Sequence, residues 1–257
     1  TTMLESESST GLVRVLIWEG ASEMVRPHAP LTFPDGSKDA VNALRPLVGY
    51  GPEAMWVAFN PFYPPGLAQV EARNASPDRS HNETWDSLVI TGLIGFVAYL
   101  TVFISVFYLA LRWLGLLVNR RDSLLFGALL LISSVAAVTV FYFYDDGWRF
   151  FGVALPAGLI LGLGIYVTLS AFIHNDLGWD RSDLPRQLLI ITILATITAH
   201  FIEIHFGIAI AATRSYFWIQ TALLVVIGTR WAIPTAYTIF QEEEEETASL
   251  RATIINR

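Results

Sequence analysis

Cysteine is absent from the 257 residues of this chain, and charged residues make up only 15% of them. Without cysteine the chain can form no disulfide and offer no thiolate ligand to a metal, so the redox compartment cannot be inferred. The scarcity of charge goes with 53% apolar residues and a mean hydropathy of +0.49. This composition is typical of a polytopic membrane protein rather than of a soluble domain.

An excess of basic residues is also lacking. The formal net charge is −7, part of which comes from the run Glu242 to Glu246. This balance argues against a nucleic-acid partner. No stretch matches a P-loop, a dinucleotide-binding fingerprint or the nucleophile elbow of a serine hydrolase, and we expect no cofactor.

A leader is not apparent either. The chain begins Thr1-Thr2, with neither an initiator Met nor a basic segment that leads into an apolar one. We therefore identify no signal peptide, and the sequence is consistent with the later part of a longer polypeptide.

Long apolar runs are missing from residues 1–87, which hold nine of the twelve prolines. We predict that this region lies outside the membrane, because no run in it is long enough to span a bilayer. Within it, Leu12 to Val25 has helical periodicity, with Arg14 on the apolar face. The spacing of Pro and Gly after it predicts an irregular folded loop with short helices, for example around Glu53 to Phe59.

Five apolar segments follow, each about the ~20 residues that a helix needs to cross the hydrocarbon. They cover roughly 88 to 111, 123 to 144, 150 to 173, 187 to 206 and 215 to 233. The sequence therefore predicts an all-α protein in three parts. These are an extracytoplasmic region at 1–87, a five-helix transmembrane domain at 88–240 and an acidic tail at 241–257.

Arginine is distributed unevenly between the loops that join these segments. The loops after the first and third segments hold Arg112, Arg120, Arg121, Arg181 and Arg186, whereas the alternate loops hold only Arg149 and Arg214. By the positive-inside rule, residues 1–87 face the outside and the C-terminus is cytoplasmic. We therefore predict a multi-pass protein of the cytoplasmic (inner) membrane.

The first candidate site residue is His81, at the boundary between the polar region and the first apolar run. Ser80 and Glu83 have the spacing of a capping box, which predicts a helix that begins at His81. That helix would align a stripe of residues on one face, namely His81, Leu88, Gly92, Gly95 and Tyr99. The glycines would let a neighbouring helix come close.

At the first position of a helix, the positive end of the dipole favours a neutral imidazole that can accept a proton. The free N–H groups there attract anions such as phosphate. A base and an anion site would then coincide at the membrane surface. From spacing alone, however, an ordinary polar residue in a first turn is the simpler interpretation of His81.

Other polar residues are candidates on weaker grounds. Arg14 either reaches water along the apolar stripe or points into a polar site, and Arg79 is a possible phosphate ligand. Glu203 and His200 share a helical face, whereas His205 does not, which makes a metal site the less favoured interpretation. We expect Glu203 to face the bundle interior and to pair with Arg214 or an outer arginine.

The motifs in the outer region resemble those of one family. His81-Asn82, followed after nine residues by Gly92-Leu93-Ile94-Gly95, resembles a signature of the O-antigen ligase and polymerase superfamily. Arg14-Val15-Leu16-Ile17-Trp18 and Pro46-Leu47-Val48-Gly49-Tyr50-Gly51-Pro52 resemble two further elements of that family, in the same order. The resemblance covers about residues 11 to 100, and the later segments match the family's C-terminal membrane half.

This resemblance implies a metal-independent glycosyltransferase at the outer face of the cytoplasmic membrane. Such enzymes move a glycan from a polyprenyl diphosphate carrier to an acceptor hydroxyl. By analogy His81 would be the base and Arg14 would bind the donor diphosphate. We place Asn82, Arg79 and Glu203 beside them as candidate substrate-binding residues.

The chain also departs from the family pattern. Family members carry further spans ahead of the outer loop, and these are absent from the sequence. We expect them on another chain or in a longer polypeptide. The alternative is a non-catalytic membrane subunit that keeps the scaffold within a larger complex, for which the missing half and the Glu-rich tail are the arguments.

Overall fold

The computed structural model describes residues 3–33, 35–72, 75–173 and 183–229, and within these ranges the protein is helical, without a strand. The α-helices, in order, are α1 (Met3–Val25), α2 (Arg45–Val48), α3 (Met55–Ala58), α4 (Leu67–Val70), α5 (Glu83–Trp113), α6 (Arg120–Asp145), α7 (Phe151–Ile173), α8 (Leu184–Glu203) and α9 (Ala211–Gly228). The predicted all-α class is therefore confirmed. The predicted helix at 12–25 lies within α1, and α3 falls within the predicted short helix at 53–59.

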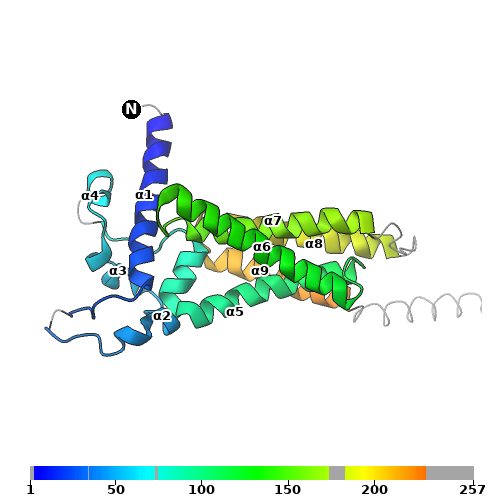
Figure 1. The fold of residues 1–257 in the computed structure, drawn as a ribbon, viewed down its shortest axis with the longest axis horizontal. Coiled ribbons are helices and arrows are strands. Elements are labelled where there is room, and N and C mark those ends of the chain that lie inside the picture. Colours follow the sequence, from blue (N-terminus) through cyan, green and yellow to red (C-terminus); the bar gives the residue numbers. More distant parts are fainter. Residues whose placement is uncertain (1–2, 34, 73–74, 174–182, 230–257) are drawn as a thin grey trace, which may run out of the picture.

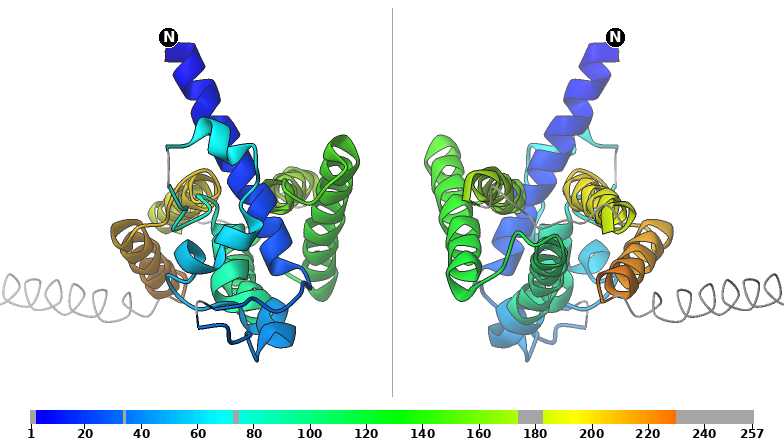
Figure 2. Two further views of the ribbon diagram at one scale, coloured as in Figure 1. Left: turned by 90° about the vertical axis from the view of Figure 1, so that its left-hand side faces the viewer. Right: turned by 90° about the vertical axis from the view of Figure 1, so that its right-hand side faces the viewer.

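Helices α5 to α9 form an elongated bundle (Figure 1). α6 packs on α7 on one side of α5, and α8 packs on α9 on the other (Figure 2). Glycines allow the close approach of α6 and α7, because a Cβ at Gly158 would lie only 2.4 Å from Ser134 Cα. The bundle core is aromatic at its centre, where Phe103, Phe201 and Phe217 pack together.

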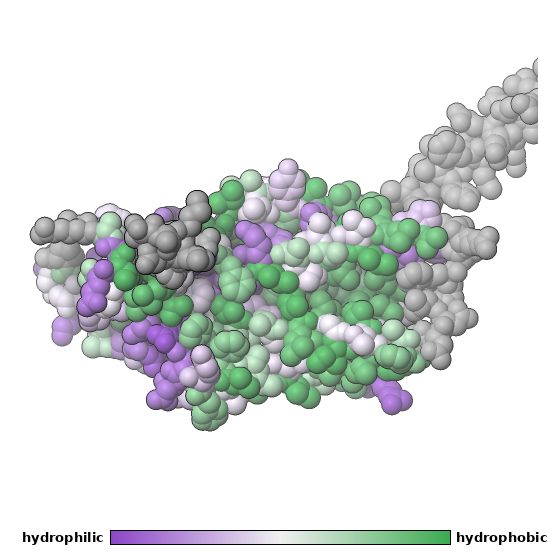
Figure 3. Space-filling model, turned by 90° about the horizontal axis from the view of Figure 1, so that it is seen from above, coloured by the Kyte–Doolittle hydropathy of each residue, from purple (hydrophilic) through white to green (hydrophobic). Residues whose placement is uncertain are grey.

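Four of the described helices, α5 to α8, are long and apolar enough to cross a membrane. The chain therefore has the build of a multi-pass membrane protein, and apolar side chains cover much of the bundle surface (Figure 3). The fifth predicted segment, 215–233, corresponds in part to α9, which is not among the four. Residues 230–233 and the acidic tail at 241–257 lie outside the described residues.

The predicted outer region gathers at one end of the bundle, where α1 runs across the bundle axis (Figure 1). Its own small core joins one face of α1 to the start of α5, with Trp18, Met24, Phe59 and Trp85 all buried. Trp18 Nε1 also donates a hydrogen bond to the Ser80 carbonyl at 2.9 Å. These contacts fix the chain just ahead of α5.

Helix α5 is broken at Gly92, where φ is 64° and ψ is −167°. It therefore changes direction within the predicted first span (Figure 1). The predicted continuous stripe from His81 to Tyr99 is wrong, because a helical face does not persist through such a break. Gly92 does receive a close neighbour, but that neighbour is α2 rather than a membrane helix.

Candidate functional site

The start of α5 differs from the predicted capping box. The helix begins at Glu83, and Asn82 is its cap, with Oδ1 accepting from Trp85 N at 3.1 Å. Ser80 instead donates to Asp86, through both its backbone N and its Oγ, each at 2.7 Å from Oδ1. The predicted capping box does not form, because the Asp86 carboxylate accepts the hydrogen bonds of Ser80. The Glu83 carboxylate pairs with Arg214 instead.

His81 lies directly before this cap, in a left-handed backbone conformation with φ of 57°. The sequence predicts His81 as the first helical residue, and this prediction is wrong. His81 is the residue ahead of the cap. Its side chain is half-buried at the end of the bundle. A left-handed residue other than glycine is uncommon, and such outliers cluster at functional sites.

Three successive carbonyls in the turn between α8 and α9 hold the residues of this site. Ile204 O accepts from Glu83 N at 3.0 Å, His205 O from Asn82 Nδ2 at 2.9 Å and Phe206 O from Arg14 Nη1 at 2.8 Å. Arg14 and Asn82 are 68 positions apart in the chain, yet both donate to one short turn, and His81 directly precedes Asn82. This arrangement brings two predicted site residues together.

Asn82 also reaches the opposite helix pair. Its Nδ2 donates to Gly152 O at 2.8 Å, near the start of α7, and the residue is fully buried. Both amide donors and the amide oxygen are thus bound within the protein. Asn82 therefore positions its neighbour His81 and leaves no donor of its own for a ligand.

An ion pair links the first turn of α5 to α9. Arg214 Nη2 lies 2.9 and 3.1 Å from the two carboxylate oxygens of Glu83, which is buried, while the Arg214 side chain is half exposed. Arg214, one of the two partners predicted for Glu203, pairs with Glu83 instead. The Glu203 side chain is 54% exposed and lies 3.6 Å from His200 Nδ1, so it does not face the bundle interior.

Further basic groups lie near the same end of α5. Arg79 pairs with Glu53 at 2.7 Å, and Arg79 and His81 both lie within electrostatic range of Asp86. Among the described residues, no three side chains of the His, Asp or Glu type converge as metal ligands would. At this end of α5, Arg79 and Arg214 are each paired with a carboxylate, and Arg14 donates one N–H to a backbone carbonyl.

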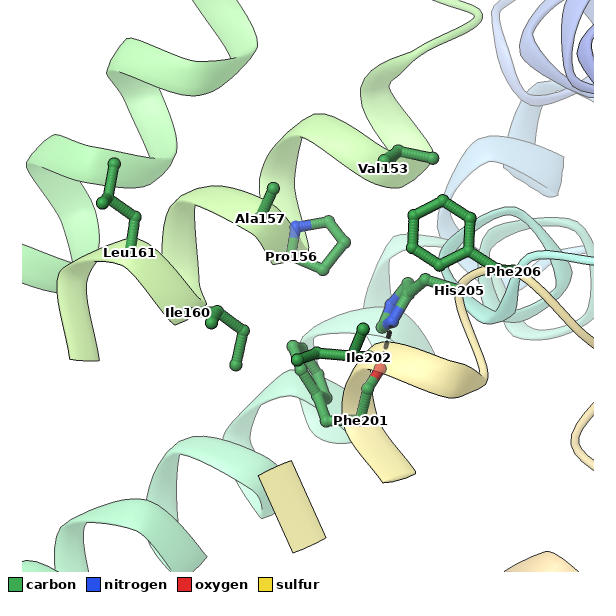
Figure 4. Close-up of a pocket in the computed structure, with 9 residues that line it drawn as sticks. All are labelled: Val153, Pro156, Ala157, Ile160, Leu161, Phe201, Ile202, His205 and Phe206. Atoms are coloured by element: carbon green, nitrogen blue, oxygen red, sulfur yellow. Dashed lines mark hydrogen bonds between the residues drawn. The ribbon is translucent and has the colours of Figure 1, made fainter. Parts of the chain in front are cut away.

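An apolar groove of about 360 Å³ opens between α7 and α8 beside the turn that holds Arg14. Pro156 and Ile160 line its α7 side, and Phe201 and Ile202 line its α8 side (Figure 4). Phe206 lies at one end of the groove. His205 contributes a buried imidazole whose Nδ1 donates to Phe201 O at 2.5 Å. Its Nε2 has no hydrogen-bond partner within the described part of the chain.

Sequence reasoning did not find the Glu83–Arg214 pair or the role of the 204–206 turn. The pair joins residues 131 positions apart, so no local spacing reports it. The sequence interpretation treats His205 only as a residue that lies off the helical face shared by His200 and Glu203. Comparison of the chain with models of protein families, with curated proteins and with solved structures found no match.

Proposed function

We propose that the protein is a membrane glycosyltransferase of the ligase or polymerase type, which moves a glycan from a polyprenyl diphosphate to an acceptor hydroxyl. One observation supports this proposal: Arg14 and Asn82, the residue that follows His81, donate to neighbouring carbonyls of a single turn. The residues proposed for the donor diphosphate and for the base therefore come from distant parts of the chain to one place. The motif resemblance supplies the reaction class.

The proposed chemistry uses His81 as the base. The acceptor oxygen bonds to the anomeric carbon of the glycan, the bond from that carbon to the diphosphate breaks, and the hydroxyl proton passes to the imidazole. The diphosphate leaves with its charge balanced by guanidinium groups. Arg14 uses one of its five N–H donors on Phe206 O, and the other N–H groups suit a bidentate phosphate contact.

The groove between α7 and α8 suits the apolar part of such a donor. It begins at Phe206, whose carbonyl holds Arg14, and its lining is almost entirely hydrocarbon. A polyprenyl chain in this groove would place its diphosphate beside Arg14. We further propose that this end of the bundle faces the outside of the cytoplasmic membrane, as the arginine distribution favours.

Two substitutions test the proposal in cells that make the polyprenyl-linked glycan. His81→Asn keeps a residue that tolerates the left-handed backbone but cannot act as the base, and we expect a loss of transfer of about 10²–10⁴-fold. Arg14→Lys should also weaken transfer strongly, because an ammonium cannot make the bidentate contact. The measurement is the amount of polyprenyl-linked glycan that accumulates unreacted.

Arg26→Lys is the matched control, because Arg26, directly after α1, pairs with Glu23 and both side chains are exposed. It should transfer at the wild-type rate, and all three variants should accumulate in the membrane to the wild-type level. Wild-type transfer by His81→Asn and Arg14→Lys would contradict the proposal. It would favour the non-catalytic subunit of a larger membrane complex instead.

A further inference from the structure

The segment 41–48, in the predicted outer region, presents apolar side chains to its surroundings. Val41, Leu44, Leu47 and Val48 are between 43% and 52% exposed. Val41 directly precedes a short 3₁₀ helix (Asn42–Leu44), Leu44 ends it, and Leu47 and Val48 belong to α2. An exposed cluster of this kind marks an interaction surface.

Two glycines attach this segment to the break in α5. A Cβ at Gly92 would lie 2.3 Å from the carbonyl carbon of Leu47, and a Cβ at Gly49 would lie 2.5 Å from that of Ile90. The backbones therefore touch. Tyr50 N donates to Val89 O at 2.7 Å and Gly51 N donates to Ile90 O at 3.0 Å, so the loop satisfies carbonyls next to the break.

Exposed apolar residues continue from this segment along α5. Leu93, Ile94 and Val97, directly after the break, are between 47% and 63% exposed and belong to a candidate membrane span. The segment 41–48 meets α5 at Gly92, where these residues begin. Its apolar surface is thus continuous with the surface that α5 turns towards lipid.

The charged side chain of the segment is turned inward. Arg45 donates to both carboxylate oxygens of Asp39, at 2.8 and 3.1 Å, and to Gly49 O at 3.1 Å. The backbone of the segment is also bonded internally, since Leu44 N donates to Val41 O and Gly49 N to Arg45 O. Polar groups that are paired within the protein are what a segment needs in order to enter a bilayer.

We propose that residues 41–48 lie in the lipid bilayer, at the boundary between head groups and acyl chains, beside the break in α5. We infer that lipid covers this exposed surface, because the segment packs against α5, a candidate membrane span. The one charged residue of the segment, Arg45, is paired with Asp39. Short amphipathic segments bind this boundary through their apolar face. The proposal does not depend on the glycosyltransferase activity. It differs from the expectation that residues 1–87 lie wholly outside the membrane.

Single cysteines test this placement cleanly, because the chain has none of its own. Leu44→Cys and Val48→Cys would carry an environment-sensitive fluorophore, with the full chain in nanodiscs of phosphatidylethanolamine and phosphatidylglycerol. We expect blue-shifted emission that is quenched by lipid spin-labelled near the head group and that is insensitive to aqueous iodide. Ile94→Cys is the control for a lipid-facing position, and Ser37→Cys, at an exposed turn, is the control for water.

Two results would overturn the proposal. Iodide quenching of the Leu44 and Val48 labels equal to that at Ser37 would place the segment in water. Protection from both iodide and spin-labelled lipid would mean that protein covers the surface. In the same preparations, the label at Ile94 should be quenched by spin-labelled lipid and not by iodide, which would show that the chain is correctly inserted.

Discussion

Gly92 and Gly49 lie where the segment 41–48 packs against the break in α5. Gly92 has φ of 64° and ψ of −167°, and Gly49 has φ of 72° and ψ of −170°. This part of backbone space is essentially restricted to glycine. Each glycine also touches the backbone beside the other, so a side chain at either position would separate the two segments.

Gly92→Ala should therefore lower the stability of the folded protein. The backbone conformation alone costs of order 1–3 kcal/mol for a residue with a Cβ, and the clash with Leu47 adds to this cost. Thermal unfolding in detergent, followed by tryptophan fluorescence, would measure the effect. Gly164→Ala in α7 is the control, because a Cβ there meets nothing within 4 Å. It should be neutral or stabilising, and equal effects of both substitutions would contradict the packing described for Gly92.

Single residues were predicted unevenly from the sequence. Arg14 lies on α1, as the periodicity of 12–25 predicts, whereas the two parts of the His-Asn and Gly-x-x-Gly pattern meet different neighbours: Asn82 contacts the 204–206 turn and Gly92 contacts α2. The capping box failed because Ser80, Glu83 and Asp86 offered two local pairings, and their spacing could not decide between them. The Glu83–Arg214 pair and the three carbonyls at 204–206 depend on tertiary contacts, which a local pattern does not contain.

At the level of elements, the long helices follow from hydrophobic periodicity and length, and the predicted spans agree with α5 to α8. The break in α5 was missed because Gly92 was interpreted as a packing residue, whereas its backbone conformation ends one helical direction and begins another. The close pair of α6 and α7 was also missed. Its signal was in the sequence, as Gly158 and Gly162 lie four apart in an apolar helix.

The segment with α2 should respond to acid. Hydrogen bonds from Arg45 hold the pKa of Asp39 below its ordinary value, and His28 lies near enough to act in the same direction. A depressed pKa in the folded state means that the stabilisation is fully present above the unfolded pKa of about 3.9, and is lost as the pH falls through the folded pKa. Hydrogen exchange of residues 39–50 should therefore be slow at pH 6 and accelerate, after correction for intrinsic rates, below about pH 4.

Asp39→Asn is the comparison for this prediction, since it removes the titrating group and leaves Arg45 in place. The variant should exchange faster than the wild type at pH 6 and show little further change on acidification. An unchanged wild-type response in Asp39→Asn would assign the acid sensitivity to another group.

The whole molecule is a bundle with an added outer region at one end, and this asymmetry makes its orientation measurable. If the outer region faces the cell exterior, a cysteine at Ser37 should react with a membrane-impermeant maleimide in intact cells. A cysteine at Val118, which is 70% exposed in the turn between α5 and α6, should react only after permeabilisation. The reverse labelling pattern would contradict the arginine-based orientation and the outer-face activity proposed from it.

The hydrogen bonds at 204–206 have a consequence for biogenesis. Arg14 is translated 192 positions before its acceptor and Asn82 123 positions before one of its own. At a translation rate of about 5–20 residues per second, Phe206 is synthesised roughly 10–40 seconds after Arg14. Neither residue can make these hydrogen bonds until the turn between α8 and α9 has been synthesised. A nascent chain halted in α8 therefore carries the motif residues without the carbonyls at 204–206 that position Arg14 and Asn82.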